Sequence, residues 1–274
     1  TIPQQEKGRK FEEKYAQLQY MFVGGDIEKL SEVKADRAKE SARLKWIAYK
    51  DQFFSTVLIA DDAFESTQME STPLNALSRY IKEYNTTTSL PLDITGKKTT
   101  DLHYYLGPNH YNTLKAYDKD VEKADRLHLN ELVPLGWKIV SWINKALVIP
   151  MFNLFTSWGL HIGIVILLMT LVIKLIILPF VFASYKSSAK MRVLKPQLDE
   201  INEKYPPEKM QERQQATMAL YQKAGVNPMS GCLPMLFQFP VLMAMFWFLP
   251  TAIELRGQSL FWADDLSTYD AIIT

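Results

Sequence analysis

Three polar side chains interrupt the two most apolar stretches of the sequence. Lys174 lies inside the apolar run 160–183, and Thr170 precedes it by four residues, which places both on one face of a helix. Gln238 lies between two phenylalanines in the second apolar run. A charge inside a membrane-spanning helix costs about 2.5–3.5 kcal/mol, so it is retained mainly where it faces a protein interior or water. The three residues therefore predict a hydrated groove that receives polar or acidic parts of another molecule.

Each of these residues also has a simpler structural explanation. Lys174 is nine residues, or about 13 Å, from the nearer end of its run, so its side chain could extend only partly to the membrane surface. The Thr170 hydroxyl could bond to a carbonyl of its own helix. Gln238 could join two helices by a hydrogen bond. We favour the groove for Lys174, and both explanations stay open for the other two.

The rest of the sequence offers no covalent chemistry. It contains no phosphate-binding loop, no zinc-protease motif and no nucleophile elbow, so we expect neither an enzyme nor a metal or cofactor site. The net charge of +1 argues against a dedicated nucleic-acid site. Cys232, the one cysteine, excludes an internal disulfide and is expected to be a small packing residue.

Two transmembrane helices must position the polar residues. Residues 160–183 are long and apolar enough to cross a bilayer. Residues 226–253 form the second span, and their prolines predict a bent helix. Residues 134–150 predict an amphipathic helix on the membrane surface that ends at Pro150, or alternatively a helix packed on a soluble domain. Residues 254–274 are expected to form a loop outside.

A charged segment, residues 184–224, separates the two spans. Two helical patterns on either side of Pro206-Pro207 predict a helical hairpin. Short loops rich in Lys and Arg stay in the cytoplasm, so the hairpin is expected inside and the N-terminal region outside. The basic residues predicted to contact a cytoplasmic partner are Lys190, Arg192, Lys195, Lys204, Lys209 and Arg213.

Residues 1–130 predict part of an antiparallel β-sandwich. The β-branched and aromatic residues of 46–60 indicate one or two strands, and 90–94 and 100–106 are short strand candidates. Residues 61–90 are rich in Thr, Ser and charge and are interpreted as a loop with an edge strand. Residues 26–44 are interpreted as a solvated strand–loop region or a marginal helix.

Several short motifs resemble the YidC family of bacterial membrane-protein insertases, which also includes the mitochondrial Oxa and chloroplast Alb insertases. The motifs are KMRVLKP at 190–196, MALY at 218–221 and, most specifically, VNPMSGCLPMLFQFP at 226–240. Upstream, YLGP at 105–108 resembles the end of the family's periplasmic domain. The first 15 residues hold no signal anchor, and a new apolar run begins at the end, so we expect a piece of a longer protein.

The resemblance implies a five-helix core around a hydrophilic groove, of which this chain holds two spans, preceded by a periplasmic β-domain. The family's groove charge falls on Lys174, where many members have arginine, its groove threonine on Thr170 and its glutamine on Gln238. The implied location is the bacterial inner membrane. The implied partners are nascent membrane-protein clients, the lipid bilayer, the ribosome and the Sec translocon, and no cofactor is implied.

Two other classes of function fit parts of the sequence. A secondary transporter could use Lys174 as a counter-ion for an anionic solute. A periplasmic binding domain could use the apolar helices only as an anchor. The predicted hairpin and the motif at 226–240 have no role in transport. An anchored binding domain should tolerate leucine at position 174 and should bind a ligand through residues 1–130 alone. We favour a membrane-protein insertase.

Overall fold

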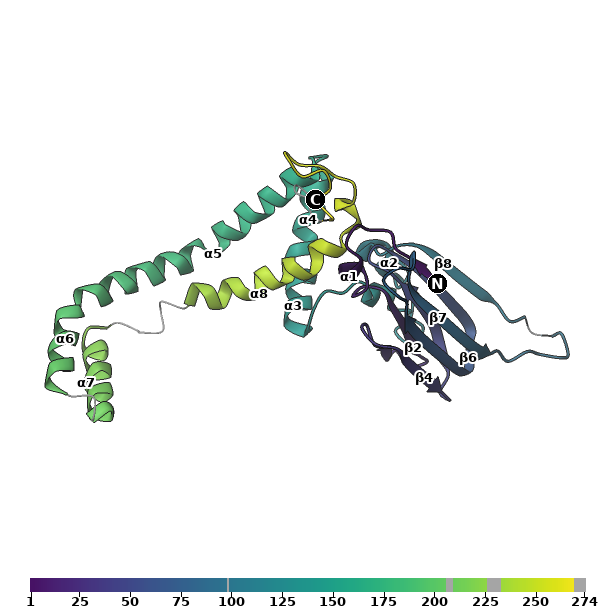
Figure 1. The fold of residues 1–274 in the computed structure, drawn as a ribbon, viewed down its shortest axis with the longest axis horizontal. Helices are drawn as coiled ribbons and strands as arrows, with labels where there is room; N and C mark the ends of the chain where they lie inside the picture. The colour runs from purple at the N-terminus through teal and green to yellow at the C-terminus, as the bar shows by residue number, and fades with distance from the viewer. Residues whose placement is uncertain (98, 206–208, 226–232, 269–274) are drawn as a thin grey trace. The chain divides into compact units, whose positions relative to one another are not determined.

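The computed structural model describes residues 1–97, 99–205, 209–225 and 233–268 (Figure 1). The chain divides into two compact units. The N-terminal unit comprises Thr1–Leu135 together with the described part of Trp247–Thr274, and the helical unit comprises Gly136–Phe246. Each unit is described by itself.

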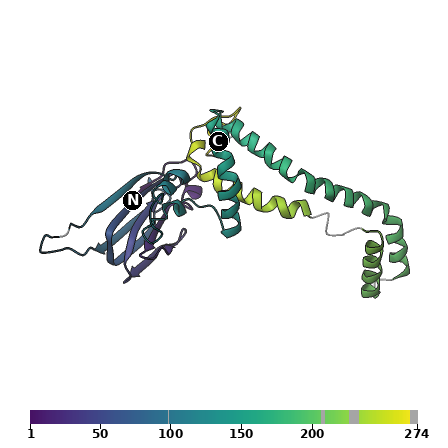
Figure 2. The same ribbon diagram turned by 180° about the vertical axis from the view of Figure 1, so that it is seen from behind.

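Eight antiparallel strands form the N-terminal unit, and the long strand β6 is central to them (Figures 1 and 2). The first half of β6 pairs with β5 and β8, and its second half pairs with β4 and β7. The strands are β1 (Ile2–Pro3), β2 (Gln17–Phe22), β3 (Ile27–Lys29), β4 (Asp36–Glu40), β5 (Leu44–Lys50), β6 (Phe54–Pro73), β7 (Tyr80–Ser89) and β8 (Leu102–Pro108).

Strand β6 bends between its two halves and so joins two layers. Ala63 and Ser66 have positive φ angles of 70° and 44°, and the register shifts in this region, which is typical of β-bulges. The core lies between the layers and includes Leu18, Tyr20, Leu30, Leu44, Ile47, Ala60, Phe64 and Met69. The predicted β-sandwich is confirmed.

The interpretation of residues 61–90 as mainly loop is wrong, because the second half of β6 and all of β7 lie there. Exposed and half-buried residues alternate along much of β7, so its Thr and charged residues are the solvent-facing half of a strand. Residues 90–94 form no strand, whereas 100–106 fall largely within β8. Residues 26–44 contain β3 and β4, so the strand–loop interpretation is correct there.

Three short helical elements lie among the described residues of Thr1–Leu135 in the N-terminal unit. These are α1 (Arg9–Glu12), α2 (Tyr111–Ala116) and the 3-10 helix η1 (Leu129–Leu132). The Trp46 side chain is fully buried, and its Nε1 donates to the Leu127 carbonyl at 2.7 Å. Leu114, Leu129 and Leu132 are also fully buried. The segment before the first long helix is therefore part of the N-terminal unit's core.

The helical unit begins with one helix built from three segments. These are α3 (Lys138–Ile143), the π-helical segment η2 (Asn144–Val148) and α4 (Ile149–Ser157). The prediction that Pro150 ends this helix is wrong. Pro150 occupies the first turn of α4, where its missing N–H is tolerated, and the wider π turn precedes it.

The remaining helices are α5 (Ile162–Val193), α6 (Lys195–Lys204), α7 (Met210–Lys223) and α8 (Leu233–Phe248), whose last two residues belong to the N-terminal unit. By length and composition, Lys138–Ser157 and Ile162–Val193 could each cross a membrane, and Met235–Thr251 is a shorter apolar helix. The predicted boundary at residue 183 is wrong, because α5 continues to Val193 and includes the first ten residues of the predicted hairpin. Helices α6 and α7 lie side by side as a helical hairpin (Figures 1 and 2). Its Pro206-Pro207 turn and the first seven residues of the motif at 226–240, which include Cys232, lie outside the described residues.

Candidate functional site

Helix α5 presents Thr170 and Lys174 on an exposed face. Four of its buried positions recur every four residues and form one stripe, namely Val165, Met169, Ile173 and Ile177. Thr170 and Lys174 each follow a buried position by one residue, which is a rotation of about 100° around the helix. Both side chains are exposed and lie one turn apart. The structure thus places these two predicted residues together.

The Thr170 hydroxyl donates to the Ile166 carbonyl at 2.9 Å. This is the local backbone bond that the sequence offered as an alternative. A hydroxyl that donates one hydrogen bond still has lone pairs that can accept another. Lys174 forms no hydrogen bond or ion pair with the part of the chain that the structure describes. Its ammonium is therefore available to a ligand.

Gln238 lies on α8, half-buried between the exposed rings of Phe237 and Phe239. The ring of Phe237 contacts that of Phe180 on α5, with centroids 4.5 Å apart and planes tilted by 30°. On α8, this contact lies one position before Gln238. On α5, it lies six positions, or about 9 Å, beyond Lys174. Within the described residues, no hydrogen bond joins Gln238 to Thr170 or Lys174.

The six basic residues of the hairpin lie at helix ends or on the surface. The last turn of α5 holds two of them, where positive charge complements the helix dipole. Lys209 is the N-cap residue of α7, and its Nζ forms an ion pair with Glu212 at 3.4 Å. Five of the six are exposed and the last is half-buried: Lys190, Arg192, Lys195, Lys204, Lys209 and Arg213.

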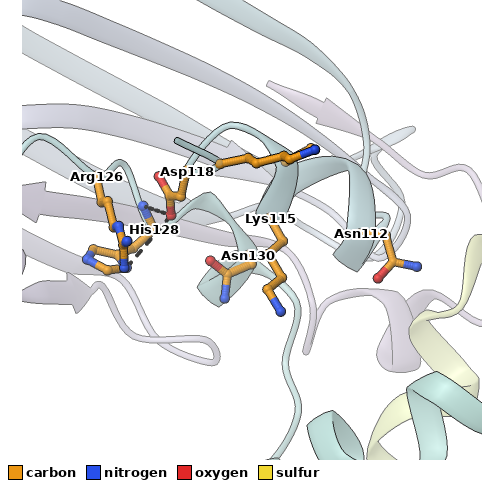
Figure 3. Close-up of a pocket in the computed structure, with 8 residues that line it drawn as sticks. Asn112, Lys115, Asp118, Arg126, His128 and Asn130 are labelled. Atoms are coloured by element: carbon orange, nitrogen blue, oxygen red, sulfur yellow. Dashed lines mark hydrogen bonds and ion pairs between the residues drawn. The ribbon is translucent and has the colours of Figure 1, made fainter. Parts of the chain in front are cut away.

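A pocket of about 440 Å³ opens beside α2 in the N-terminal unit, and no sequence pattern indicated it (Figure 3). Lys115, Arg126, His128 and Asn130 are among its lining residues. The Asp118 carboxylate accepts from two backbone N–H groups of residues 127 and 128, at 2.7 and 3.0 Å, and so holds the lining loop in place. The lining holds three basic side chains, Lys115, Lys119 and Arg126, against one carboxylate, Asp118, so the pocket is net basic. Among the described residues, no group of His, Cys, Asp or Glu is arranged to hold a metal.

Among the described residues of the N-terminal unit, two lysines are buried, and no sequence pattern singled them out. Lys50 is 1% exposed and its Nζ donates to the Leu132 carbonyl at 2.8 Å. Lys82 is also 1% exposed and its Nζ donates to the carbonyls of Ala16 at 2.5 Å and Glu32 at 2.7 Å. Burial lowers the pKa of each ammonium to about 8. Both lysines join separate segments of the fold rather than facing a ligand.

Comparison with known proteins identifies the family. The family model of the YidC periplasmic domain matches residues 2–150, and that of the 60Kd inner membrane protein matches residues 152–274. The chain belongs to the YidC family. Both parts of the chain, the β-domain and the apolar helices, therefore have counterparts in one family.

Relatives with the curated name membrane protein insertase YidC align with most or all of the chain. The Parabacteroides distasonis protein is 53% identical over 274 residues, covering all of this chain and 43% of the relative. The Bacteroides fragilis protein is 52% identical over 270 residues, covering 98% of the chain and 43% of the relative. The Amoebophilus asiaticus protein is 41% identical over 231 residues, covering 84% of the chain and 37% of the relative.

The family assignment confirms the predicted resemblance, the predicted fold class and the predicted location. The protein is an inner-membrane protein with a periplasmic β-domain and apolar helices that can span the bilayer. The chain spans about 43% of the length of the first two relatives described above.

Proposed function

We propose that the protein inserts membrane-protein clients into the inner membrane by a groove that includes Lys174, Thr170 and Gln238. The observation that carries the proposal is the exposed polar face of α5. Its lysine has no partner among the described residues, and the stretch of α8 that bears Gln238 contacts α5 through an aromatic pair. The relatives' name, membrane protein insertase, supports the same function.

In the proposed mechanism, the groove reduces the desolvation cost of moving a client's polar flank across the membrane. An exposed ammonium at Lys174 attracts a client carboxylate and can donate to it. The Thr170 hydroxyl and the Gln238 amide replace part of the water that the flank loses. Lysine is a flexible point charge, so the groove recognises negative charge rather than the bidentate geometry that an arginine would read.

The free energy for insertion comes from the client itself. Each CH₂ group that leaves water for the bilayer contributes about 0.8 kcal/mol, so one span far exceeds the cost of a short polar flank. Exposed apolar side chains on α8, such as Leu236, Phe239 and Leu242, offer a surface along which that span can move into lipid. The mechanism uses no covalent step and no cofactor.

The hairpin α6–α7 is proposed to meet the client or the ribosome in the cytoplasm. Its exposed basic residues can contact acidic protein surfaces or RNA phosphates at short range. The Sec translocon is a further proposed partner, acting beside the groove for larger clients. A chain with its hairpin deleted should then still bind clients weakly but insert them slowly.

The test compares lysine, arginine and leucine at position 174 in the full-length protein in proteoliposomes. The readout is protease protection of a single-span client with an acidic tail. Lys174→Arg should keep insertion, and Lys174→Leu should slow it about 10–100-fold, because a hydrogen bond to a charged group contributes about 1.5–3 kcal/mol. A client whose acidic residues are replaced by Asn and Gln should show a much smaller difference.

A matched control moves the charge without removing it. Ile176 is exposed on α5 and is turned about 160° away from Lys174 around the helix. The double variant Lys174→Leu/Ile176→Lys keeps the composition of α5 but presents the lysine on another face, so it should stay as slow as Lys174→Leu. Insertion at the wild-type rate by Lys174→Leu would refute the role of the groove charge.

A further inference from the structure

The segment that follows α8 is part of the N-terminal unit. It continues as the 3-10 turns η5 (Leu249–Thr251) and η6 (Ile253–Leu255). Thr251, Ala252 and Leu255 are 1–4% exposed, although they lie only a few residues beyond an apolar helix. The Thr251 hydroxyl donates to the Phe248 carbonyl at 3.1 Å and so caps the end of α8. The outer end of α8 is therefore held in a packed environment.

Arg256 makes a charge-assisted contact in this region. Its Nε donates to Oε1 of Glu6 at 2.8 Å. Its guanidinium carbon lies 5.6 Å from the ring centroid of Phe53 and 5.5 Å from that of Phe54. A planar guanidinium over aromatic rings gains both stacking and cation–π attraction. Arg256 thus joins the chain's first residues, the β5–β6 turn and the segment after α8.

Two further contacts reach residues that precede this arginine in the segment. Gln52 is buried in the β5–β6 turn, and its Nε2 donates to the Pro250 carbonyl at 2.7 Å. His110 Nε2 lies 3.3 Å from Oε1 of Glu254. The contacts therefore reach the segment at residues 250, 254 and 256, spread over nearly two helical turns of chain.

The β5–β6 turn, which contacts Pro250 and Arg256, is held by its own hydrogen bonds. The Asp51 carboxylate accepts from the N–H groups of Phe53 and Phe54 at 2.8 and 2.6 Å. The Asn109 side chain donates to the Asp51 carbonyl at 3.1 Å and accepts from the Ser55 hydroxyl at 2.5 Å. A turn with its own backbone groups satisfied can act as a fixed anchor for another segment.

We propose that Arg256, Gln52 and Glu6 form a latch by which the periplasmic domain fixes the outer end of α8. These are positioning residues, because they touch no client and act through the helix that carries Gln238. The latch gives the periplasmic domain a role in the insertase core, and that role rests on the proposed function. The latch itself is a local structural contact and can be tested apart from insertion.

The first test is hydrogen exchange on the full-length protein in lipid nanodiscs. The reporting amides are those of Ala252, Leu255 and Arg256, which donate to carbonyls within the segment. In Arg256→Ala, their exchange should increase about tenfold, which corresponds to about 1.4 kcal/mol. Arg256→Lys keeps the charge but loses the planar stacking, so its increase should be smaller.

The matched control is Arg37→Ala, which removes an exposed ion pair with Glu70 at 2.8 Å between β4 and β6. It should leave exchange in the latch unchanged. The amides of β5 report general destabilisation and should not change in Arg256→Ala. Unchanged latch exchange in Arg256→Ala, or an equal increase in β5, would overturn the proposal.

The second test measures insertion by the same variants. Arg256→Ala should slow insertion of the acidic-tailed client about threefold or more, and Arg256→Lys should restore part of the rate. Faster exchange in the latch with an unchanged insertion rate would overturn the positioning role. Because the proposed function is tested at Lys174, a failure at Arg256 leaves that result intact, so the two outcomes are distinguishable.

Discussion

The free energy of unfolding of the periplasmic domain should rise between pH 7 and pH 9, and replacing Lys50 with methionine should remove about half of that rise. Lys50 is buried, and its Nζ has one hydrogen-bond acceptor, the Leu132 carbonyl. Burial lowers the pKa of its ammonium from an ordinary value of 10.5 to about 8, with the nearby Lys29 acting in the same direction. The folded protein therefore holds this proton less firmly than the unfolded chain does.

The sign of the effect follows from proton counting. Between pH 8 and 10.5, the unfolded chain binds more protons at Lys50 than the folded protein does, so the free energy of unfolding rises with pH. The full pKa difference corresponds to about 3 kcal/mol, of which roughly 1–2 kcal/mol is gained by pH 9. Lys82 has a pKa lowered to about 8 by burial as well, so it contributes a second gain of similar size.

Two opposing terms decide what Lys50→Met does at pH 7. Methionine removes the buried charge, which relieves about 3 kcal/mol of desolvation. It also leaves the Leu132 carbonyl without its donor, which costs about 1–3 kcal/mol. The variant should therefore be as stable as the wild type at pH 7, or up to about 2 kcal/mol more stable.

The assay is pulse proteolysis in urea of the full-length protein in nanodiscs, with subtilisin, at pH 7 and pH 9. The wild type should gain stability with pH, and Lys50→Met should gain roughly 1–2 kcal/mol less. Lys45→Met, on the same strand, controls for replacing a lysine with methionine. An equal gain in the wild type and Lys50→Met, or a loss above about 3 kcal/mol at pH 7, would refute the reasoning.

Two further changes test local packing in the same domain. Gly107→Ala would place its Cβ 2.8 Å from the Tyr105 hydroxyl oxygen, so the ring must move, and we expect a loss of about 1–2 kcal/mol in the urea assay. Arg9 donates to four backbone carbonyls of residues 74–80. Arg9→Ala should cost about 2–3 kcal/mol and speed tryptic cleavage of the β6–β7 connection about tenfold or more, and an unchanged cleavage rate would contradict this.

Local sequence patterns were sufficient to predict the strands that combine β-branched or aromatic residues with burial, such as β5 and β8. They were insufficient for β7 and the second half of β6, because those segments are rich in Thr, Ser and charge. Their strand conformation depends on pairing with each other and with β4, which is a long-range property. A 20-residue strand that bends at Ala63 and Ser66 is likewise read as a loop by local propensity.

At the candidate site, too, local patterns predict some features, and long-range contacts determine the others. The spacing of Thr170 and Lys174 is enough to place them on one helix face, because four residues make about one turn. The contact between Phe180 and Phe237 depends on how two helices cross, which no local pattern contains. The ion pair between Glu6 and Arg256 joins residues 250 positions apart, so sequence order gave no reason to connect them.

The β5–β6 turn links the periplasmic domain to the chain on both sides of the helices. Lys50 bonds to the carbonyl of Leu132, a few residues before α3, and Gln52 bonds to the carbonyl of Pro250, directly after α8. The two side chains are only two positions apart, on a turn that Asp51 holds rigid. One structural element thus anchors both the segment that leads into the helices and the segment that leaves α8. A buried lysine costs stability at neutral pH, and its ammonium holds the incoming segment through the Leu132 carbonyl, a bond that an apolar side chain cannot make.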